Sequence, residues 1–112
     1  MGNFKTLWVW DEGINFATEI YKITKAGEFE KDYGLRNQIQ RAVVSISANI
    51  SEGEERDTNR QTVHFFRIAK ASNAEVFTLL QIAYRIGYIK KETLEKLEPT
   101  SNKLGYLSLI HI

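Results

Sequence analysis

The chain has 112 residues, 43% of them hydrophobic and 26% charged, and its formal net charge is +1. It contains no cysteine, which excludes a disulfide scaffold and a metal site built from thiolates. This length and composition predict one globular domain over residues 1–112. No apolar run approaches the roughly 18 residues of a membrane span, and the N-terminus lacks a signal-peptide pattern. We therefore expect a cytoplasmic protein that does not enter a membrane.

The first predicted helix covers residues 8–25, where apolar residues recur at alternating spacings of three and four in a heptad pattern. Its expected buried seam consists of Leu7, Trp10, Ile14, Ala17, Tyr21 and Thr24. Gly13 weakens the helix by about 1 kcal/mol relative to Ala, so packing has to hold this segment helical. Residues 26–31 are predicted to form a loop.

The second predicted helix covers residues 33–53 and places large apolar, small and polar residues on one face. The residues of that face are Leu35, Ile39, Ala42, Val43, Ile46, Asn49 and Ile50. Asp32 is expected to cap the N-terminus of this helix, and Gly53 its C-terminus. A polar hinge at residues 54–57 follows.

The third predicted helix begins at Thr58, where residues 58–61 match a capping box, and it ends at Ile86 before Gly87. Its expected seam consists of Phe65, Ile68, Ser72, Val76, Leu79, Ala83 and Ile86. A second apolar stripe recurs on the same helix, although a bundle helix needs only one. The excess is explained by deep burial within one chain or by a covering subunit. The predicted oligomer-interface residues are Phe66, Phe77, Leu80, Tyr84 and Tyr88.

The fourth predicted helix begins near Lys91, and its seam consists of Leu94, Leu97, Ser101, Leu104 and Ser108. Pro99 should kink this helix near Glu98 or lie in the first turn of a restarted helix. No segment alternates with the two-residue period of a strand. Four amphipathic helices with short loops predict an all-α fold, an antiparallel up-down-up-down four-helix bundle.

Several short motifs occur along the chain in the order and at the spacing that are typical of a known family. They are Leu7-x-Val9-Trp10, Tyr33-Gly34-Leu35-x-x-Gln38-Ile39, Arg41-Ala42-Val43-Val44-Ser45-Ile46, Ala48-Asn49-Ile50-x-Glu52-Gly53, Phe66-x-Ile68-Ala69-x-x-Ser72-x-x-Glu75 and Gly87-Tyr88-Ile89. In these motifs, over about residues 4–90, the chain resembles the four-helix-bundle family of 23S rRNA intervening-sequence proteins. It departs from the family pattern at Ser47, where proline is usual, at Pro99, and in the apolar tail of residues 107–112.

A related branch of this family is the accessory variability protein of diversity-generating retroelements, a homopentamer that binds nucleic acid and works with a reverse transcriptase. The resemblance therefore implies that the chain is a homo-oligomer, with a homopentamer favoured, and that RNA or DNA is a candidate partner.

Basic residues are concentrated in residues 58–91, where six of them accompany the single acidic residue Glu75. The six candidate nucleic-acid-binding residues are Arg60, Arg67, Lys70, Arg85, Lys90 and Lys91. Such a segment predicts electrostatic contacts to phosphates that do not depend on sequence, with Tyr84 or Tyr88 as candidate stacking residues for single strands. The alternatives are a solvated helix face, an assembly protein that binds a protein partner without nucleic acid, and a small-ligand binder.

Glu75 lies next to Val76 on the apolar face, and a buried carboxylate requires a partner. We predict a structural polar cluster that fixes the helix register, formed by Arg41, Ser45, Asn49 and Glu75. No glutamate precedes His64 or His111 by three residues, so the sequence predicts no metal site of the di-metal bundle type. No phosphate-binding glycine loop or nucleophile elbow occurs, and we expect neither catalytic residues nor a cofactor.

Overall fold

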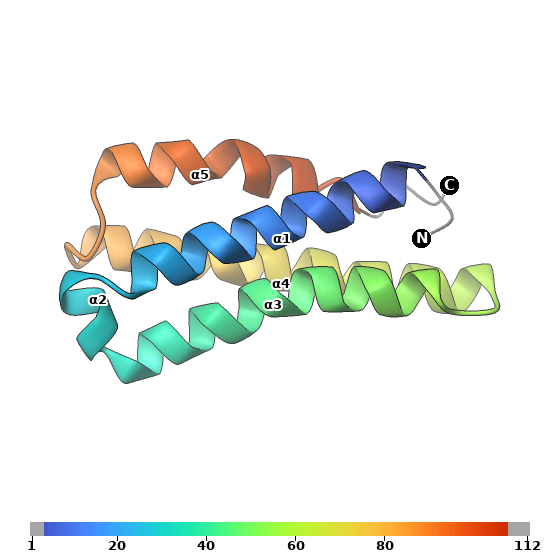
Figure 1. Cartoon of the computed structure of the whole chain (residues 1–112), viewed down its shortest axis with the longest axis horizontal. Helices are drawn as coiled ribbons and strands as arrows, with labels where there is room; N and C mark the ends of the chain where they lie inside the picture. Colours follow the sequence, from blue (N-terminus) through green and yellow to red (C-terminus); the bar gives the residue numbers. More distant parts are fainter. Residues whose placement is uncertain (1–3, 108–112) are drawn as a thin grey trace.

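The structure is a computed structural model and describes residues 4–107. Its helices are α1 (Phe4–Thr24), α2 (Gly27–Lys31), α3 (Tyr33–Glu54), α4 (Asn59–Arg85) and α5 (Lys91–Leu104). The four long helices run in alternating directions, as Figure 1 shows. Both α1 and α4 contact α3 on one side and α5 on the other. The predicted all-α, up-down-up-down bundle is therefore confirmed for the described part of the chain.

The predicted N-caps of α3 and α4 are both formed. The Asp32 carboxylate accepts a hydrogen bond from the backbone N–H of Leu35 at 3.1 Å. The Thr58 hydroxyl accepts one from the N–H of Gln61 at 3.2 Å. Each cap satisfies a backbone donor that has no partner within its own helix, which is why the two helices begin where the sequence predicts.

The predicted stop at Gly87 is also formed. Gly87 has φ +86°, a conformation that side chains with a Cβ rarely adopt. Its N–H donates to the carbonyl of Tyr84 at 3.1 Å, and the N–H of Tyr88 donates to the carbonyl of Ala83 at 2.8 Å. This pair of bonds is a Schellman motif, which ends α4 and fixes the direction of Tyr88.

Two local predictions are wrong. Residues 26–31 are not an irregular loop, because they contain the short helix α2, which buries Phe29 in the core. Gly53 is not a C-terminal cap, because α3 continues through it to Glu54. Gly53 is buried against α4, and a Cβ atom at this position would lie 2.8 Å from the ring of Phe66. The glycine therefore allows α3 and α4 to approach closely.

Pro99 neither ends nor restarts the last helix, because α5 runs without a break from Lys91 to Leu104. A buried polar contact next to the proline joins α5 to α4. The side-chain amide of Asn73 donates to the carbonyl of Ser101 at 2.9 Å, and the Ser101 hydroxyl donates to the Asn73 amide oxygen at 3.2 Å. Leu107, the first residue of the apolar tail, is buried in the core. The seam residue Ser108 and the remaining tail residues, 109–112, lie outside the described residues.

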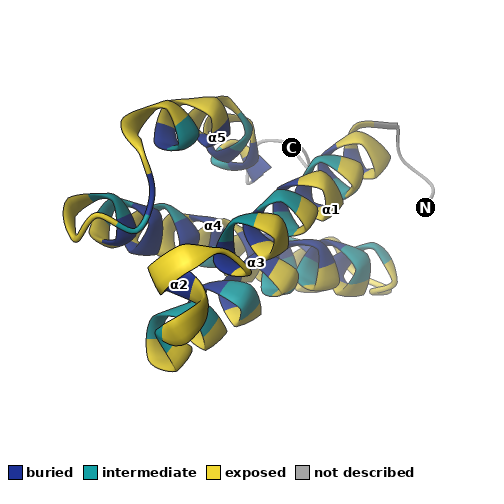
Figure 2. Cartoon of the chain, turned by 60° about the vertical axis from the view of Figure 1, so that its left-hand side comes forward, coloured by how far each residue is buried: buried dark blue, intermediate teal, exposed yellow. Residues whose placement is uncertain are grey.

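The seam predicted for α1 is displaced by one residue. The residues that α1 buries are Thr6, Val9, Gly13, Phe16, Ile20 and Thr24. The predicted seam residues Leu7, Ile14 and Tyr21 are exposed instead. Thr24 belongs to both sets, and the predicted residues Trp10 and Ala17 are half-buried against the core. Both sets repeat at heptad spacing, so α1 carries two adjacent apolar stripes, of which one is fully buried and the other only in part. Figure 2 shows the buried residues facing the centre of the bundle.

Gly13 explains the choice between the two stripes. A Cβ atom at this position would meet the hydroxyl of Ser47, so only glycine permits this approach of α1 to α3. The Ser47 hydroxyl donates to the backbone carbonyl of Trp10 at 3.0 Å. The closest contact between the two helices is therefore made by small residues and a hydrogen bond, and the large side chains of the second stripe are displaced outward.

Candidate functional site

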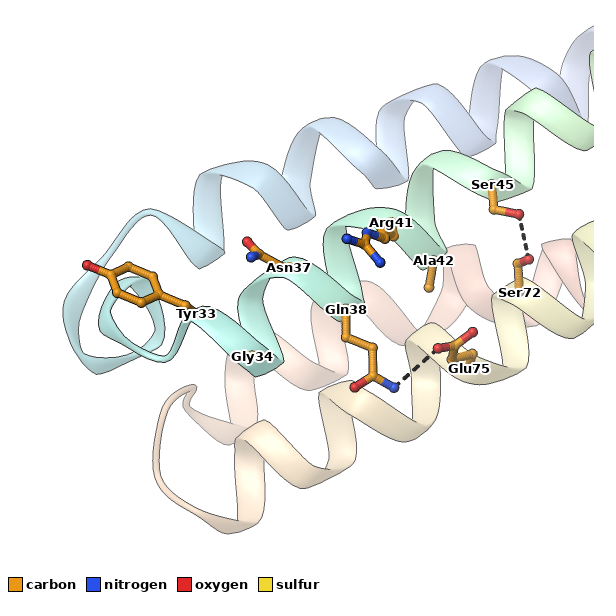
Figure 3. Close-up of a pocket in the computed structure, with 9 residues that line it drawn as sticks. All are labelled: Tyr33, Gly34, Asn37, Gln38, Arg41, Ala42, Ser45, Ser72 and Glu75. Atoms are coloured by element: carbon orange, nitrogen blue, oxygen red, sulfur yellow. Dashed lines mark hydrogen bonds between the residues drawn. The ribbon is translucent and has the colours of Figure 1, made fainter.

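A solvent-open groove of about 720 Å³ lies between α3 and α4 near the start of α3. Figure 3 shows that α3 supplies most of its lining and that α4 supplies Ser72 and Glu75. The lining residues are Tyr33, Gly34, Asn37, Gln38, Arg41, Ala42, Ser45, Ser72 and Glu75. The groove therefore contains three of the four residues predicted to form a polar cluster.

Hydrogen bonds across the groove join α3 to α4. The hydroxyls of Ser45 and Ser72 lie 2.8 Å apart, and the side-chain amide of Gln38 donates to the Glu75 carboxylate at 3.3 Å (Figure 3). The side-chain amide of Asn49 donates to the carbonyl and the hydroxyl of Ser45 at 2.8 and 2.9 Å. These bonds pair polar groups of the two helices with one another, and Arg41 takes part in none of them.

The predicted role of Glu75 is wrong in two respects. Glu75 is exposed rather than buried, and it hydrogen-bonds Gln38 rather than Arg41 or Asn49. The reason is its position on α4, at the edge that borders the groove, whereas the adjacent Val76 faces the core. Gln38 lies in the family motif at residues 33–39. Nothing in the sequence around Gln38 indicates that its side chain hydrogen-bonds Glu75.

Arg41 is the one cation that lines this groove. It is exposed and makes no ion pair with any carboxylate in residues 4–107. It also borders a second groove of about 550 Å³, in which Tyr21 of α1 faces Val44 and Ala48 of α3. A guanidinium in such a position can bind a carboxylate or a phosphate through parallel N–H bonds.

The groove contains no catalytic arrangement. Neither the Ser45 nor the Ser72 hydroxyl bonds a histidine or a carboxylate, so no base activates them as nucleophiles. His64 lies on α4 beyond this groove, with its ring 5.3 Å from the ring of Phe65. Within residues 4–107, no group of three or more histidine, aspartate and glutamate side chains is arranged to hold a metal ion.

All six basic residues proposed from the sequence are exposed, but they do not form one cluster. Arg60, Arg67 and Arg85 share the outward row of α4, opposite its buried face. Arg67 and Arg85 are about 27 Å apart at 1.5 Å per residue. Lys70 is turned about 60° from Arg67 around the helix axis, because successive helical residues are turned by about 100°. Lys91 is paired with Glu95 at 3.9 Å, and Lys90 precedes α5.

The outward row of α4 nevertheless has one electrostatic property that the sequence did not reveal. Its members repeat at heptad spacing and are Arg60, His64, Arg67, Ala71, Ala74, Thr78, Gln81 and Arg85. None of them is acidic, and the three arginines pair with no carboxylate in the described part of the chain. The row is therefore basic at both ends and small and neutral between them.

The predicted oligomer interface on α4 is wrong for two of its five residues. Phe66 and Leu80 are each 1% exposed and belong to the core of a single chain. Phe77, Tyr84 and Tyr88 are half-buried, and the last two pack against the core. Part of the stripe assigned to another subunit therefore belongs to the core, and Phe66 packs against Gly53 of α3.

Part of the stripe predicted to form the core is on the surface instead. Ile68 and Ile86 of the predicted seam are exposed, as is Ile82, and Ile86 reaches 51%. On the opposite side of α3, the displaced stripe of α1 is continued by Val44, which is 47% exposed. We name these surfaces the α4 stripe (Ile68, Ile82, Ile86) and the α1–α3 stripe (Leu7, Ile14, Tyr21, Val44).

These features lie on a bundle whose sequence matches the profile of one family. The profile of the 23S rRNA-intervening sequence protein family matches residues 5–108. The chain belongs to this family. No protein in a search of curated sequences matches it. Within residues 4–107, no helix has the length and apolar character that crossing a membrane requires.

A protein whose crystal structure has been solved shares this fold. The chain is similar to the crystal structure of a protein of unknown function from the S23 ribosomal protein family of Bacteroides thetaiotaomicron. The two are 26% identical, the TM-score is 0.85, and the match covers 95% of this chain and 96% of the other. The family assignment and the bundle fold therefore agree, and neither indicates an enzymatic activity.

Proposed function

We propose that this family member is a non-enzymatic assembly protein whose bundles associate with one another, in a ring of five as the family resemblance favours. The observation that carries the proposal is the exposure of large apolar side chains on the α1–α3 stripe and the α4 stripe. Covering exposed apolar side chains in an interface stabilises by about 25 cal/mol per Å² of apolar surface removed from water.

The positions of the two stripes support a head-to-tail contact. The α1–α3 stripe borders the groove between α1 and α3, the α4 stripe lies on α4, and the two stripes share no residue. A contact between two different patches repeats from subunit to subunit and closes into a ring when the rotation allows it. A two-fold dimer needs only one self-complementary patch, so a second stripe favours the ring.

The polar groove between the stripes is compatible with burial in such a contact. The Ser45–Ser72 and Gln38–Glu75 hydrogen bonds already satisfy four of its polar atoms, which lowers the cost of removing those atoms from water. Arg41 would need an acidic partner from the neighbouring subunit, because an unpaired buried charge is strongly unfavourable.

The mass of the protein in solution tests this proposal. Light scattering at micromolar concentration should give a multiple of the 12.9 kDa chain mass. A monomer under these conditions would contradict self-association and would leave the two stripes as ordinary surface.

A second candidate function, electrostatic binding of RNA or DNA, is favoured by the outward row of α4. Its exposed arginines have no carboxylate partners in the described residues and no acidic neighbour in the row. Assembly would repeat this row around a ring and multiply a modest positive surface. Phosphate contacts release counterions, so the affinity should be similar for all sequences and should fall steeply with salt.

Titration of labelled RNA and DNA at two salt concentrations tests the second candidate. The expected result is weak binding that is lost at the higher salt and is reduced for every sequence by Arg67→Glu. Absence of binding at low salt would favour the alternative, an assembly protein that recognises a protein partner. A small-ligand function has less support, because the grooves described above are open to solvent.

A further inference from the structure

The exposed aromatic residue that faces the basic helix is not the one expected from the sequence. Tyr88 is held by a hydrogen bond to Asp32 and by its ring, which lies 5.5 Å from the ring of Phe29. Tyr84 is half-buried against the core. Tyr106, in the turn that follows α5, is 65% exposed. Only a ring with an accessible face can stack on a base, so Tyr106 meets this requirement better than Tyr84 or Tyr88.

Tyr106 belongs to a groove of about 540 Å³ between α4 and α5. The groove is lined by Asn73, Ala74, Phe77, Ser101, Asn102, Gly105 and Tyr106. Ala74 and Gly105 contribute little side-chain bulk, which leaves room for a flat ring beside Tyr106. Phe77 adds a half-buried aromatic surface. These features suit a planar, partly apolar ligand.

One polar side chain in this groove is available for recognition. Asn73 and Ser101 hydrogen-bond each other and are buried. Asn102 is exposed, and its side-chain amide makes no hydrogen bond in residues 4–107. A carboxamide offers one acceptor and two donors, the groups that the edge of a nucleobase complements. The groove therefore combines a stacking surface with a hydrogen-bonding side chain.

The charges around the groove favour a phosphate chain on its α4 side. Ala74 belongs both to the groove and to the outward row of α4, in which no residue is acidic. Arg67 lies two turns, about 10 Å, before Ala74, and Lys70 lies in the turn between them. On the α5 side, Glu98 lies one turn before Asn102 and would repel phosphate. A backbone is thus attracted by α4 while a base can reach the groove.

We propose that the groove between α4 and α5 receives an unpaired base of a single-stranded nucleic acid, with Tyr106 stacking on the base and Asn102 hydrogen-bonding its edge. This proposal rests on the second candidate function and adds a preference for single strands over duplexes. A base inside a duplex is stacked on its neighbours and cannot enter the groove.

The test compares a labelled single strand with the duplex that it forms, at low salt, for five proteins. These are the wild type, Tyr106→Ala, Tyr106→Phe, Asn102→Ala and Tyr33→Ala. Tyr106→Ala removes one stacking contact, so this variant should bind the single strand roughly 5- to 100-fold more weakly than the wild type does. Its affinity for the duplex should be unchanged. Tyr106→Phe should bind as the wild type does, because it keeps the ring. Tyr33 is the matched control, since its ring is 67% exposed but lies at the start of α3.

The remaining outcomes separate this proposal from the function on which it rests. If Tyr106→Ala and Asn102→Ala both bind the single strand as tightly as the wild type does, the proposed base-binding site is overturned. The proposal of electrostatic binding would then still stand. An equal loss for single strand and duplex would also overturn it, because the groove would then contact only the backbone. Failure of the wild type to bind either nucleic acid would overturn both. Thermal melts by circular dichroism confirm that each variant is folded.

Discussion

Asp32 and Tyr88, which are 56 residues apart in the chain, share one carboxylate group between two tasks. One Asp32 oxygen caps α3 by accepting the N–H of Leu35 at 3.1 Å, and the other accepts the phenol O–H of Tyr88 at 2.9 Å. The Schellman motif at Gly87 turns Tyr88 toward this carboxylate. The bond therefore ties the start of α3 to the end of α4, at the end of the bundle where α2 also packs.

The Tyr88 contact predicts a loss of stability in alkali. The hydrogen bond to Asp32, then burial and the negative charges of Asp32 and Glu28, raise the pKa of Tyr88 above its ordinary value of 10.0. Because the folded-state pKa is raised, this contribution is fully present below pH 10.0 and is lost as the pH rises through the folded-state pKa. Between about pH 8 and about pH 11, the midpoint of urea unfolding should therefore decrease more for the wild type than for Tyr88→Phe.

The control for this comparison is Tyr33→Phe, because Tyr33 is exposed and donates no side-chain hydrogen bond in the described residues. It should follow the wild type at both pH values. An equal decline for the wild type and Tyr88→Phe would show that the phenol contributes nothing to stability.

Two glycines of α3 should respond to alanine with opposite signs. Alanine ordinarily stabilises a helix by up to about 1 kcal/mol relative to glycine. Gly34→Ala should show part of this gain, because the nearest atom to its Cβ would be an Asp32 oxygen at 3.7 Å. Gly53→Ala should destabilise by about 1–3 kcal/mol, because its Cβ would lie 2.8 Å from the Phe66 ring and 3.1 Å from the Thr62 carbonyl oxygen. Thermal unfolding of both variants measures the difference, and a Gly53→Ala protein as stable as the wild type would contradict the close approach.

Two polar residues of α4, two positions apart in the sequence, should differ in their effect on stability. Asn73 is buried and hydrogen-bonds Ser101 twice, so Asn73→Ala should cost about 1–3 kcal/mol by leaving the buried Ser101 groups without partners. Glu75 is exposed and accepts one bond from Gln38, so Glu75→Ala should stay within about 0.5 kcal/mol of the wild type. Urea unfolding of both variants tests this order, and the reverse order would restore the buried role expected for Glu75.

Features of the fold that depend on neighbouring residues could be predicted from the sequence. The caps at Asp32 and Thr58 and the stop at Gly87 each follow from residue type and position within a few residues. The period of each helix was also predictable. Its phase was not, because α1 and α4 each carry two apolar stripes of the same period, and periodicity alone does not say which one enters the core.

Contacts between distant segments account for what could not be predicted. Gly13 and Gly53 look like weak points of a helix, yet each marks a close approach to another helix. The partner of Glu75 was misjudged because Glu75 and Val76 are adjacent in sequence but face different surroundings. The sequence carries no signal for Tyr106 as a stacking residue, because its exposure depends on how the turn after α5 lies against α4.

Variants of the two stripes test whether the subunits associate head to tail. Ile14→Ser with Tyr21→Ser disables the α1–α3 stripe, and Ile82→Ser with Ile86→Ser disables the α4 stripe. All four residues are exposed, so each double variant should remain folded and close to the wild type in stability. Each should be a monomer by light scattering, because every subunit of a ring uses both surfaces. An equimolar mixture should form a dimer, since one intact α4 stripe can then meet one intact α1–α3 stripe. Assembly of either variant alone at the wild-type mass would rule out its stripe as a contact, and a mixture that stays monomeric would show that the stripes do not bind each other.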